Sequence, residues 1–180
     1  VLKLMAATLL AEGDHVLHNV PRIADVETMC DLLMSMGVDV TRTGDHTIGI
    51  HRPADVLPEA PYELVERMRA SIVVLGPLLA RYGEARVALP GGDDIGPRPI
   101  DMHLRGLEEL GATFTFAHGY IEGRADQLNG ARVVLEFPSV GATENLLMAA
   151  VLAKGTTVIE NRNVTRDMVE RAADATAKQP

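Results

Sequence analysis

One segment of the sequence concentrates side chains that could bind an anion or move a proton. It reads Pro-Gly-Gly-Asp-Asp-Ile-Gly-Pro-Arg-Pro-Ile-Asp-Met-His over residues 90–103, between a predicted strand and a predicted helix. Glycine-rich backbone before a helix can bring N–H groups close to an anion. The segment lacks the residue spacing of a Walker loop and of a dinucleotide-binding loop. On the Gly-Gly pair alone, a tight turn before a helix is the better interpretation.

Two arginines are candidate anion ligands. Arg98 lies between Pro97 and Pro99, which restrict the backbone and could hold the guanidinium ready for a phosphate or carboxylate. An ion pair on the surface explains Arg98 equally well. Arg69 enters an apolar stretch, where an unpaired buried charge would be costly. A ligand anion could neutralise it, although a nearby glutamate is slightly favoured.

A second polar loop, Phe-Pro-Ser-Val-Gly-Ala-Thr-Glu-Asn over residues 137–145, also lies between a predicted strand and an apolar helix. Ser139 or Thr143 could cap that helix, and N–H groups at a helix start also bind phosphate. The two loops occupy equivalent places in a repeat and could converge on one ligand. Asp101 and His103 could both reach that ligand from a loop, but on a helix they would point in different directions.

Composition excludes several function classes. A net charge of -8 argues against binding to nucleic acid or to a membrane surface. The single cysteine, Cys30, excludes a disulfide framework and fits burial in a cytoplasmic protein. No apolar run reaches the ~18 residues of a membrane span. The other histidines show no zinc-type clustering, and no Gly-x-Ser-x-Gly elbow is present, so we expect neither a metal site nor acyl-transfer hydrolysis.

The elements that position these loops repeat about every seventy residues. Three times, an apolar helix is followed by Gly and a short β-branched strand: Leu9-Leu10-Ala11 precedes Gly13, Leu78-Leu79-Ala80 precedes Gly83, and Val151-Leu152-Ala153 precedes Gly155. We expect each Gly to stop its helix in the left-handed conformation. A second, amphipathic helix and another strand then follow, with Val26, Met29, Leu33 and Met36 at helical spacing in the first copy.

The sequence therefore predicts an α/β (α+β) fold of pseudo-threefold repeated units, about 1–60, 61–130 and 131–180, with apolar helices enclosed by sheets. We expect one domain, 1–180. Because the sequence opens inside an apolar helix and ends after the second helix of the third unit, we expect this domain to be truncated.

Several long motifs resemble one enzyme family, UDP-N-acetylglucosamine 1-carboxyvinyltransferase, over the chain up to about Asn161. They are Leu-Met-Ala-Ala-Thr-Leu-Leu-Ala-Glu-Gly (4–13), Met-Arg-Ala-Ser (68–71), Leu-Gly-Pro-Leu (75–78), Leu-Pro-Gly-Gly (89–92), Ile-Gly (95–96), Arg-Pro-Ile-Asp-Met-His (98–103) and Pro-Ser-Val-Gly-Ala-Thr (138–143).

The resemblance implies transfer of the enolpyruvyl group of phosphoenolpyruvate to the 3'-hydroxyl of UDP-N-acetylglucosamine, the first committed step of peptidoglycan synthesis, without a metal or organic cofactor. It also implies a second domain, carrying a catalytic Asp and a further Arg, that closes over both substrates. That domain and the family's Lys-Asn pair are missing from this sequence. We therefore expect the chain alone to be inactive.

The resemblance also assigns site residues. Arg98 matches an arginine that contacts phosphoenolpyruvate, and Arg69 matches another active-site arginine. Two matched segments hold the UDP moiety in the family; they comprise Pro99, Ile100, Asp101, Met102 and His103, and Ser139, Val140 and Gly141. Asp93 stands where most members have a cysteine that acts as general acid.

The exchange of cysteine for Asp93 has consequences. A free carboxyl has a pKa of ~3.9 against ~8.5 for a thiol, so proton donation near pH 7 requires a large upward shift. A carboxylate is also a poor nucleophile, so we expect insensitivity to epoxides such as fosfomycin that alkylate the family cysteine.

Two alternatives remain open at this point. One is a different enolpyruvyl transferase, such as the shikimate-pathway member, against which the Pro-Gly-Gly-Asp loop argues. The other is a non-catalytic sugar-nucleotide-binding paralogue. The segment after Asn161 departs from the family pattern, so we expect it to be divergent or non-native.

Overall fold

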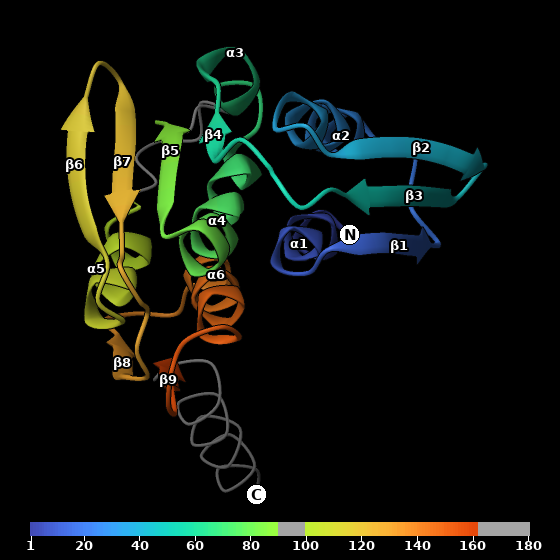
Figure 1. Ribbon diagram of the computed structural model, residues 1–180. Coiled ribbons are helices and arrows are strands. Elements are labelled where there is room, and N and C mark those ends of the chain that lie inside the picture. Colours follow the sequence, from blue (N-terminus) through green and yellow to red (C-terminus); the bar gives the residue numbers. More distant parts are fainter. Residues whose placement is uncertain (90–99, 162–180) are drawn as a thin grey trace, which may run out of the picture.

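A computed structural model describes residues 1–89 and 100–161 of the chain. Three sheets follow one another along the sequence, with three, four and two strands, and helices α4 and α6 lie between them (Figure 1). The predicted α/β architecture of repeated units is therefore confirmed.

The first segment combines two helical elements with an antiparallel sheet of order β1-β3-β2. Its elements are α1 (Leu2–Ala7), the 3-10 helix η1 (Thr8–Leu10), β1 (Gly13–His18), α2 (Ala24–Ser35), β2 (Asp39–Gly44) and β3 (Thr47–Arg52). Helix α2 buries Val26, Met29 and Leu33, as the helical spacing of these residues predicts.

The second segment forms a mixed sheet of order β4-β5-β7-β6, in which β4 pairs parallel to β5 and the other pairs are antiparallel. Its elements are β4 (Glu59–Ala60), α3 (Tyr62–Val65), the 3-10 helix η2 (Arg69–Val74), α4 (Leu75–Tyr82), β5 (Glu84–Ala88), α5 (Asp101–Glu109), β6 (Thr113–Ala117) and β7 (Tyr120–Arg124). The third segment contributes β8 (Arg132–Leu135), α6 (Val140–Ala150) and β9 (Val158–Asn161), with β8 parallel to β9.

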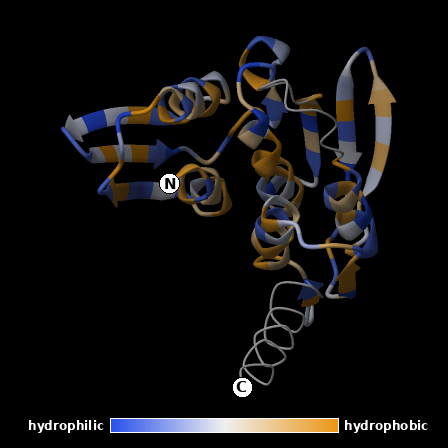
Figure 2. Ribbon diagram, turned by 180° about the vertical axis from the view of Figure 1, so that it is seen from behind, coloured by the Kyte–Doolittle hydropathy of each residue, from blue (hydrophilic) through white to orange (hydrophobic). Residues whose placement is uncertain are grey.

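The apolar helices meet in the middle of the molecule. Helix α4 packs against α6 and η1, and η2 packs against α1 and α6. In Figure 2 the central helices carry mostly hydrophobic colours, whereas the strands alternate along their length. Leu9, Leu78 and Leu146, one from each segment, have less than 2% of their surface exposed and belong to one continuous core. Burial is therefore confirmed for the faces on which these helices meet, whereas Leu4 on α1 and Leu147 on α6 are more than half exposed.

The predicted helix stops are only partly right. Gly83 is the C-cap residue of α4, in the left-handed conformation with φ of 72°. Gly13 and Gly155 also have positive φ, at 104° and 101°, but the helices before them end earlier, at Leu10 and Ala150. A few residues of extended or turn backbone therefore separate these two glycines from their helices, because the next strand starts farther from the helix end than in the second segment.

Among the described helices, none combines the length and apolar character that crossing a bilayer requires.

Candidate functional site

A groove of about 390 Å³ opens where residues of all three segments meet. Its lining residues are Lys3 and Asp25 from the first segment, Arg67, Met68, Arg69, Ala70, Ile72, Val73 and His103 from the second, and Val140, Gly141 and Glu144 from the third.

Four residues expected at the site line this groove: Arg69, His103, Val140 and Gly141. Arg69 is the first residue of η2, His103 lies in the first turn of α5, and Val140 and Gly141 begin α6. Residues from the first turns of three helical elements thus line one hollow. N–H groups in a first turn have no partner within the helix and favour anions. The arrangement can bind an anionic ligand.

Ser139, one of the two candidates that the sequence offered, is the N-cap residue of α6. Its Oγ accepts a hydrogen bond from the backbone N–H of Ala142 at 3.2 Å, and the Thr143 hydroxyl donates to the Ser139 carbonyl at 2.7 Å. These bonds fix the backbone on which Val140 and Gly141 approach the groove.

The remaining expected residues that are described lie beside the groove. Ile100 is the N-cap residue of α5 and Asp101 its first residue. Asp101 lies 3.9 Å from Arg105, one helical turn later, and is not among the groove lining. The Met102 side chain is 6% exposed and borders a different hollow, beside β8. Because α5 begins at Asp101, Asp101 and His103 point in different directions, and only His103 faces the groove.

Three expected residues, Asp93, Arg98 and Pro99, lie outside the described residues. Their place relative to the groove stays a prediction from the sequence.

Sequence reasoning did not single out four charged groove residues: Lys3, Asp25, Arg67 and Glu144. Lys3 Nζ lies 2.8 Å from Glu144 Oε1, so α1 and α6 are joined by an ion pair at the groove wall. A signal existed for Lys3, because it is a cation inside an otherwise apolar helix, as Arg69 is beside its apolar stretch. In a chain of net charge -8, the groove gathers three cations against two carboxylates.

His103 is the buried titratable group of the groove, with 6% of its surface exposed. Burial and the nearby charge of Arg69 lower the pKa of its imidazole to about 4, against the opposing charge of Asp101. His103 is therefore neutral at pH 7. Its Nδ1 lies 3.0 Å from the Asn145 side-chain nitrogen.

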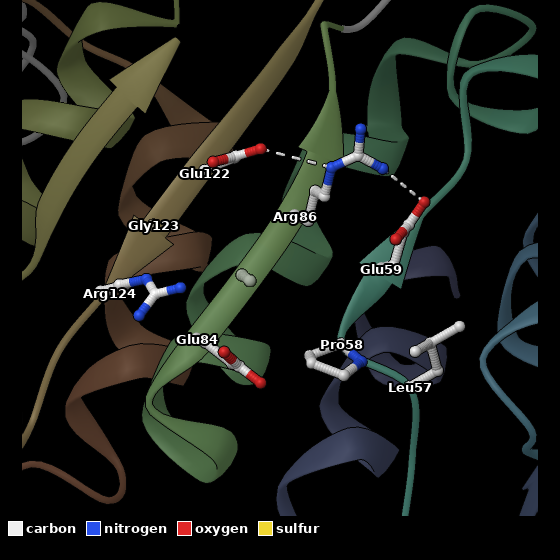
Figure 3. A pocket seen from close by; sticks show the side chains of 9 residues that line it. Leu57, Pro58, Glu59, Glu84, Arg86, Glu122, Gly123 and Arg124 are labelled. Atoms are coloured by element: carbon white, nitrogen blue, oxygen red, sulfur yellow. Dashed lines mark hydrogen bonds and ion pairs between the residues drawn. The ribbon is translucent and has the colours of Figure 1, made fainter. Parts of the chain in front are cut away.

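A second hollow, of about 270 Å³, lies on the second sheet between β4, β5 and β7 (Figure 3). Its central cation, Arg86, is 2.6 Å from Glu59 and 3.4 Å from Glu122, and its guanidinium stacks 3.5 Å from the centre of the Tyr120 ring. Arg86 is thus neutralised within the protein, and none of the expected site residues lines this hollow. We assign these contacts to holding the strands together.

Three of the other histidines bond to groups outside the groove. His15 bonds to the Ala11 carbonyl at 3.0 Å, His46 to the Val20 carbonyl at 3.0 Å, and His51 to the Asp14 carboxylate at 2.7 Å. Within the described residues, no three His, Cys, Asp or Glu side chains gather in a way that could hold a metal ion. Cys30 is buried, as predicted, and burial raises the pKa of its thiol to about 11.

Residues 1–175 match the family model described as EPSP synthase (3-phosphoshikimate 1-carboxyvinyltransferase). The match continues past Asn161, where the sequence resemblance was expected to end. The family match therefore includes part of the segment after Asn161, and the divergence expected of that segment stays a prediction.

Curated relatives named UDP-N-acetylglucosamine 1-carboxyvinyltransferase are similar over most of the chain. The relative from Solidesulfovibrio magneticus is 57% identical over 158 residues, 88% of this chain and 38% of its own length. That from Corynebacterium efficiens is 55% identical over 89% of this chain and 38% of its own. That from Nitratidesulfovibrio vulgaris is 52% identical over 95% of this chain and 40% of its own. The chain thus spans about two fifths of the length of these relatives.

Two solved structures share the fold at low sequence identity. The enolpyruvyl transferase NikO from Streptomyces tendae is 20% identical with a TM-score of 0.76, over 96% of this chain and 40% of that one. An EPSP synthase from Acinetobacter baumannii is 21% identical with a TM-score of 0.68, over 97% and 41%.

Proposed function

Because the chain belongs to the EPSP synthase family of carboxyvinyltransferases, we propose that it is the sugar-nucleotide-binding domain of a UDP-N-acetylglucosamine 1-carboxyvinyltransferase. The enzyme transfers the enolpyruvyl group of phosphoenolpyruvate to the 3'-hydroxyl of UDP-N-acetylglucosamine in the cytoplasm. Relatives carrying that name are 52–57% identical to this chain, whereas the solved EPSP synthase is 21% identical. This contrast favours the sugar nucleotide over a shikimate derivative.

The observation that carries the proposal is the convergence of Arg69, His103, Val140 and Gly141 on one groove. The family resemblance named these residues from sequence alone. His103 comes from one matched segment, Val140 and Gly141 come from another, and Arg69 is a separate match. Their meeting in one hollow with two further cations, Lys3 and Arg67, supports a site for an anionic nucleotide.

Each groove residue then has a role. Arg69 neutralises charge of the ligand, supported by Arg67, while the ion pair between Lys3 and Glu144 holds the groove wall. The start of α6, fixed by the Ser139 cap, offers backbone N–H groups to a phosphate. His103 offers an imidazole edge beside Gly141, since a Cβ built on Gly141 would lie 3.5 Å from His103 Nε2. Asp93 is assigned to proton transfer and Arg98 to binding phosphoenolpyruvate, as the family resemblance of the sequence implies.

The proposal places the remaining catalytic groups outside this chain. The second domain closes over the groove and brings the catalytic Asp and a further Arg. The 180 residues are then expected to bind the sugar nucleotide without turning it over.

Isothermal titration of the folded chain tests the proposal, with folding checked first by circular dichroism. UDP-N-acetylglucosamine is titrated beside UDP and shikimate-3-phosphate. The Arg69→Ala variant is expected to bind at least about tenfold more weakly, because a hydrogen-bonded charge contact contributes roughly 1.5–3 kcal/mol. Arg132→Ala is the matched control, since Arg132 pairs with Glu160 away from the groove.

Preference for UDP-N-acetylglucosamine, lost in Arg69→Ala and kept in Arg132→Ala, supports the proposal. Preference for shikimate-3-phosphate, or no binding of either compound by the folded chain, overturns it. Binding without turnover by the protein supplemented with its second domain would favour the non-catalytic paralogue instead.

A further inference from the structure

A buried asparagine, Asn145, joins the groove to the packed helices. Its surface is 0% exposed, and it lies on α6 one residue after Glu144 of the groove lining. In the sequence it stands where the second polar loop, residues 137–145, passes into the apolar helix, and no role was assigned to it there. A buried amide must nevertheless satisfy all of its donors and acceptors.

The backbone fixes which way the Asn145 amide points. Its Oδ1 accepts a hydrogen bond from the Gly76 N–H at 2.7 Å, and its Nδ2 donates to the Ile72 carbonyl at 3.1 Å. Exchanging the two amide atoms would set two donors against each other at Gly76 and two acceptors at Ile72. The network therefore excludes the flipped amide.

This orientation in turn decides where the His103 proton lies. The second N–H of Asn145 points at His103 Nδ1, 3.0 Å away. An N–H donor requires a lone pair on its partner, so Nδ1 carries no proton. In a neutral imidazole the proton is then on Nε2. Nε2 lies on the opposite side of the ring, beside Gly141 at the groove wall.

We propose that Asn145 is a positioning residue that holds His103 as a neutral imidazole, with Nδ1 as acceptor and Nε2–H presented to the groove as a fixed hydrogen-bond donor. The donor fits an acceptor oxygen of an anionic nucleotide. The positive charge that attracts the anion comes from Arg69 on η2. The other charged groups around His103 and the groove are Asp101, Lys3, Asp25, Arg67 and Glu144. The opposite tautomer would place a lone pair against the ligand oxygen and repel it.

The role assigned to the donor rests on the proposed function, but the tautomer does not. Protonation to imidazolium would break the Asn145 bond, because Nδ1–H and the amide N–H would then face each other. This conflict acts in the same direction as burial and the charge of Arg69, which lower the pKa of His103 to about 4.

Nitrogen-15 NMR of the histidine rings tests the assignment in the unliganded protein. The chain has six histidines, and His103→Gln identifies the His103 signals by their loss. We expect a lone-pair nitrogen at Nδ1, a protonated nitrogen at Nε2, and no titration of this ring near pH 6.5. A protonated Nδ1 at pH 7 overturns the proposal, and this measurement requires no variant at Asn145.

Asn145→Asp provides a second test, since a carboxylate of the same shape can only accept hydrogen bonds. Nδ1 of His103 should become protonated, and the pKa of the ring should rise above ~6.5, its ordinary value. Asn129→Asp is the matched control, because the side-chain amide of Asn129 donates to the Gln127 carbonyl two residues away. An unchanged His103 spectrum in folded Asn145→Asp, at a pH where carbon-13 NMR shows the new carboxyl to be ionised, contradicts the positioning role.

Addition of UDP separates the two proposals. A shift at Nε2 with Nδ1 unchanged supports the donor role in the groove. If the free protein shows the expected tautomer but bound UDP leaves Nε2 unmoved, the donor role is overturned while the tautomer stands. If UDP does not bind at all, the proposed function fails independently of the ring assignment.

Discussion

The neutral state of His103 has a measurable effect on stability. Its pKa is about 4 in the folded protein and ~6.5 in an unfolded chain. Between these values the unfolded state binds more protons than the folded state. The contribution of the neutral His103 to the free energy of unfolding is therefore complete above pH ~6.5 and is lost as the pH falls toward 4.

We expect His103→Gln, which cannot titrate, to flatten this dependence. From pH 7 to pH 5 the wild-type chain should lose about 2 kcal/mol more unfolding free energy than the variant. Urea unfolding followed by circular dichroism at both pH values measures the difference, and the carboxylates that titrate in this range cancel between the two proteins. An equal loss in both would mean that His103 is protonated alike in the folded and unfolded states.

Asp93 carries a prediction that comes from the sequence alone. Because a carboxylate is a weaker nucleophile than a thiolate, we expect the enzyme containing this chain to resist alkylation by fosfomycin. Mass spectrometry after incubation with fosfomycin should show no adduct on the loop, whereas Asp93→Cys should acquire one. An adduct on the native loop would contradict the expectation.

Residue types pointed to some of the groove residues but could not predict which side chains contact one another. Arg69 was a candidate because an unpaired charge beside an apolar stretch would be costly, and it lines the groove; Lys3 carries the same signal. That Lys3 meets Glu144 depends on how α1 packs near α6, which no local pattern encodes. Asn145 was missed because its three hydrogen-bond partners lie 42 to 73 residues away in the sequence.

At the scale of the helices, the close packing of α4 against α6 fixes the position of Asn145, which contacts His103. A Cβ built on Gly76 would lie 2.4 Å from both the backbone carbonyl oxygen and Oδ1 of Asn145. The absence of a side chain at Gly76 thus allows the N–H of α4 to reach the Asn145 amide. Close packing of the two helices and the orientation of His103 share this one contact.

We expect Gly76→Ala to destabilise the chain by about 2–3 kcal/mol, because backbone atoms cannot move aside as side chains can. Gly106→Ala on α5 is the control: its Cβ would meet only the methyl groups of Leu146, at 2.6 Å, and alanine favours a helix by roughly 1 kcal/mol. The control should change stability by less than about 1 kcal/mol. Urea midpoints compare the two, and similar losses would refute the backbone clash.

Element positions followed well from periodicity and less well at their ends. Helix α2 occupies the stretch that Val26, Met29 and Leu33 mark, since one face of it is buried. The start of α6 at Val140 depends on the Ser139 cap, which the sequence offered together with Thr143 as a choice. Geometry decides between them, because only a hydroxyl before the first turn can accept from its N–H groups.

Across the whole molecule, a buried arginine connects the first segment to the second. Arg52, at the end of β3, is 0% exposed. Its Nε donates to the Ala11 carbonyl at 2.8 Å, and its Nη1 donates to the Tyr82 hydroxyl at 2.8 Å. Tyr82 is the last residue of α4, the central helix. The threefold repeat in the sequence predicted that such units pack together, but it did not predict the contacts that Arg52 makes between them.

Removing the Tyr82 hydroxyl should loosen the junction without opening a cavity. We expect Tyr82→Phe to cost about 1–2 kcal/mol, because a hydrogen bond to a charged group is lost while Arg52 Nη1 keeps the Pro53 carbonyl at 2.9 Å. Tyr62→Phe, at a tyrosine that is half exposed on α3, should change stability by less than about 0.5 kcal/mol. Urea unfolding by circular dichroism measures both. If Tyr82→Phe proves as neutral as the control, the Arg52 contact contributes nothing to joining the two segments, and their packing rests on the apolar helices alone.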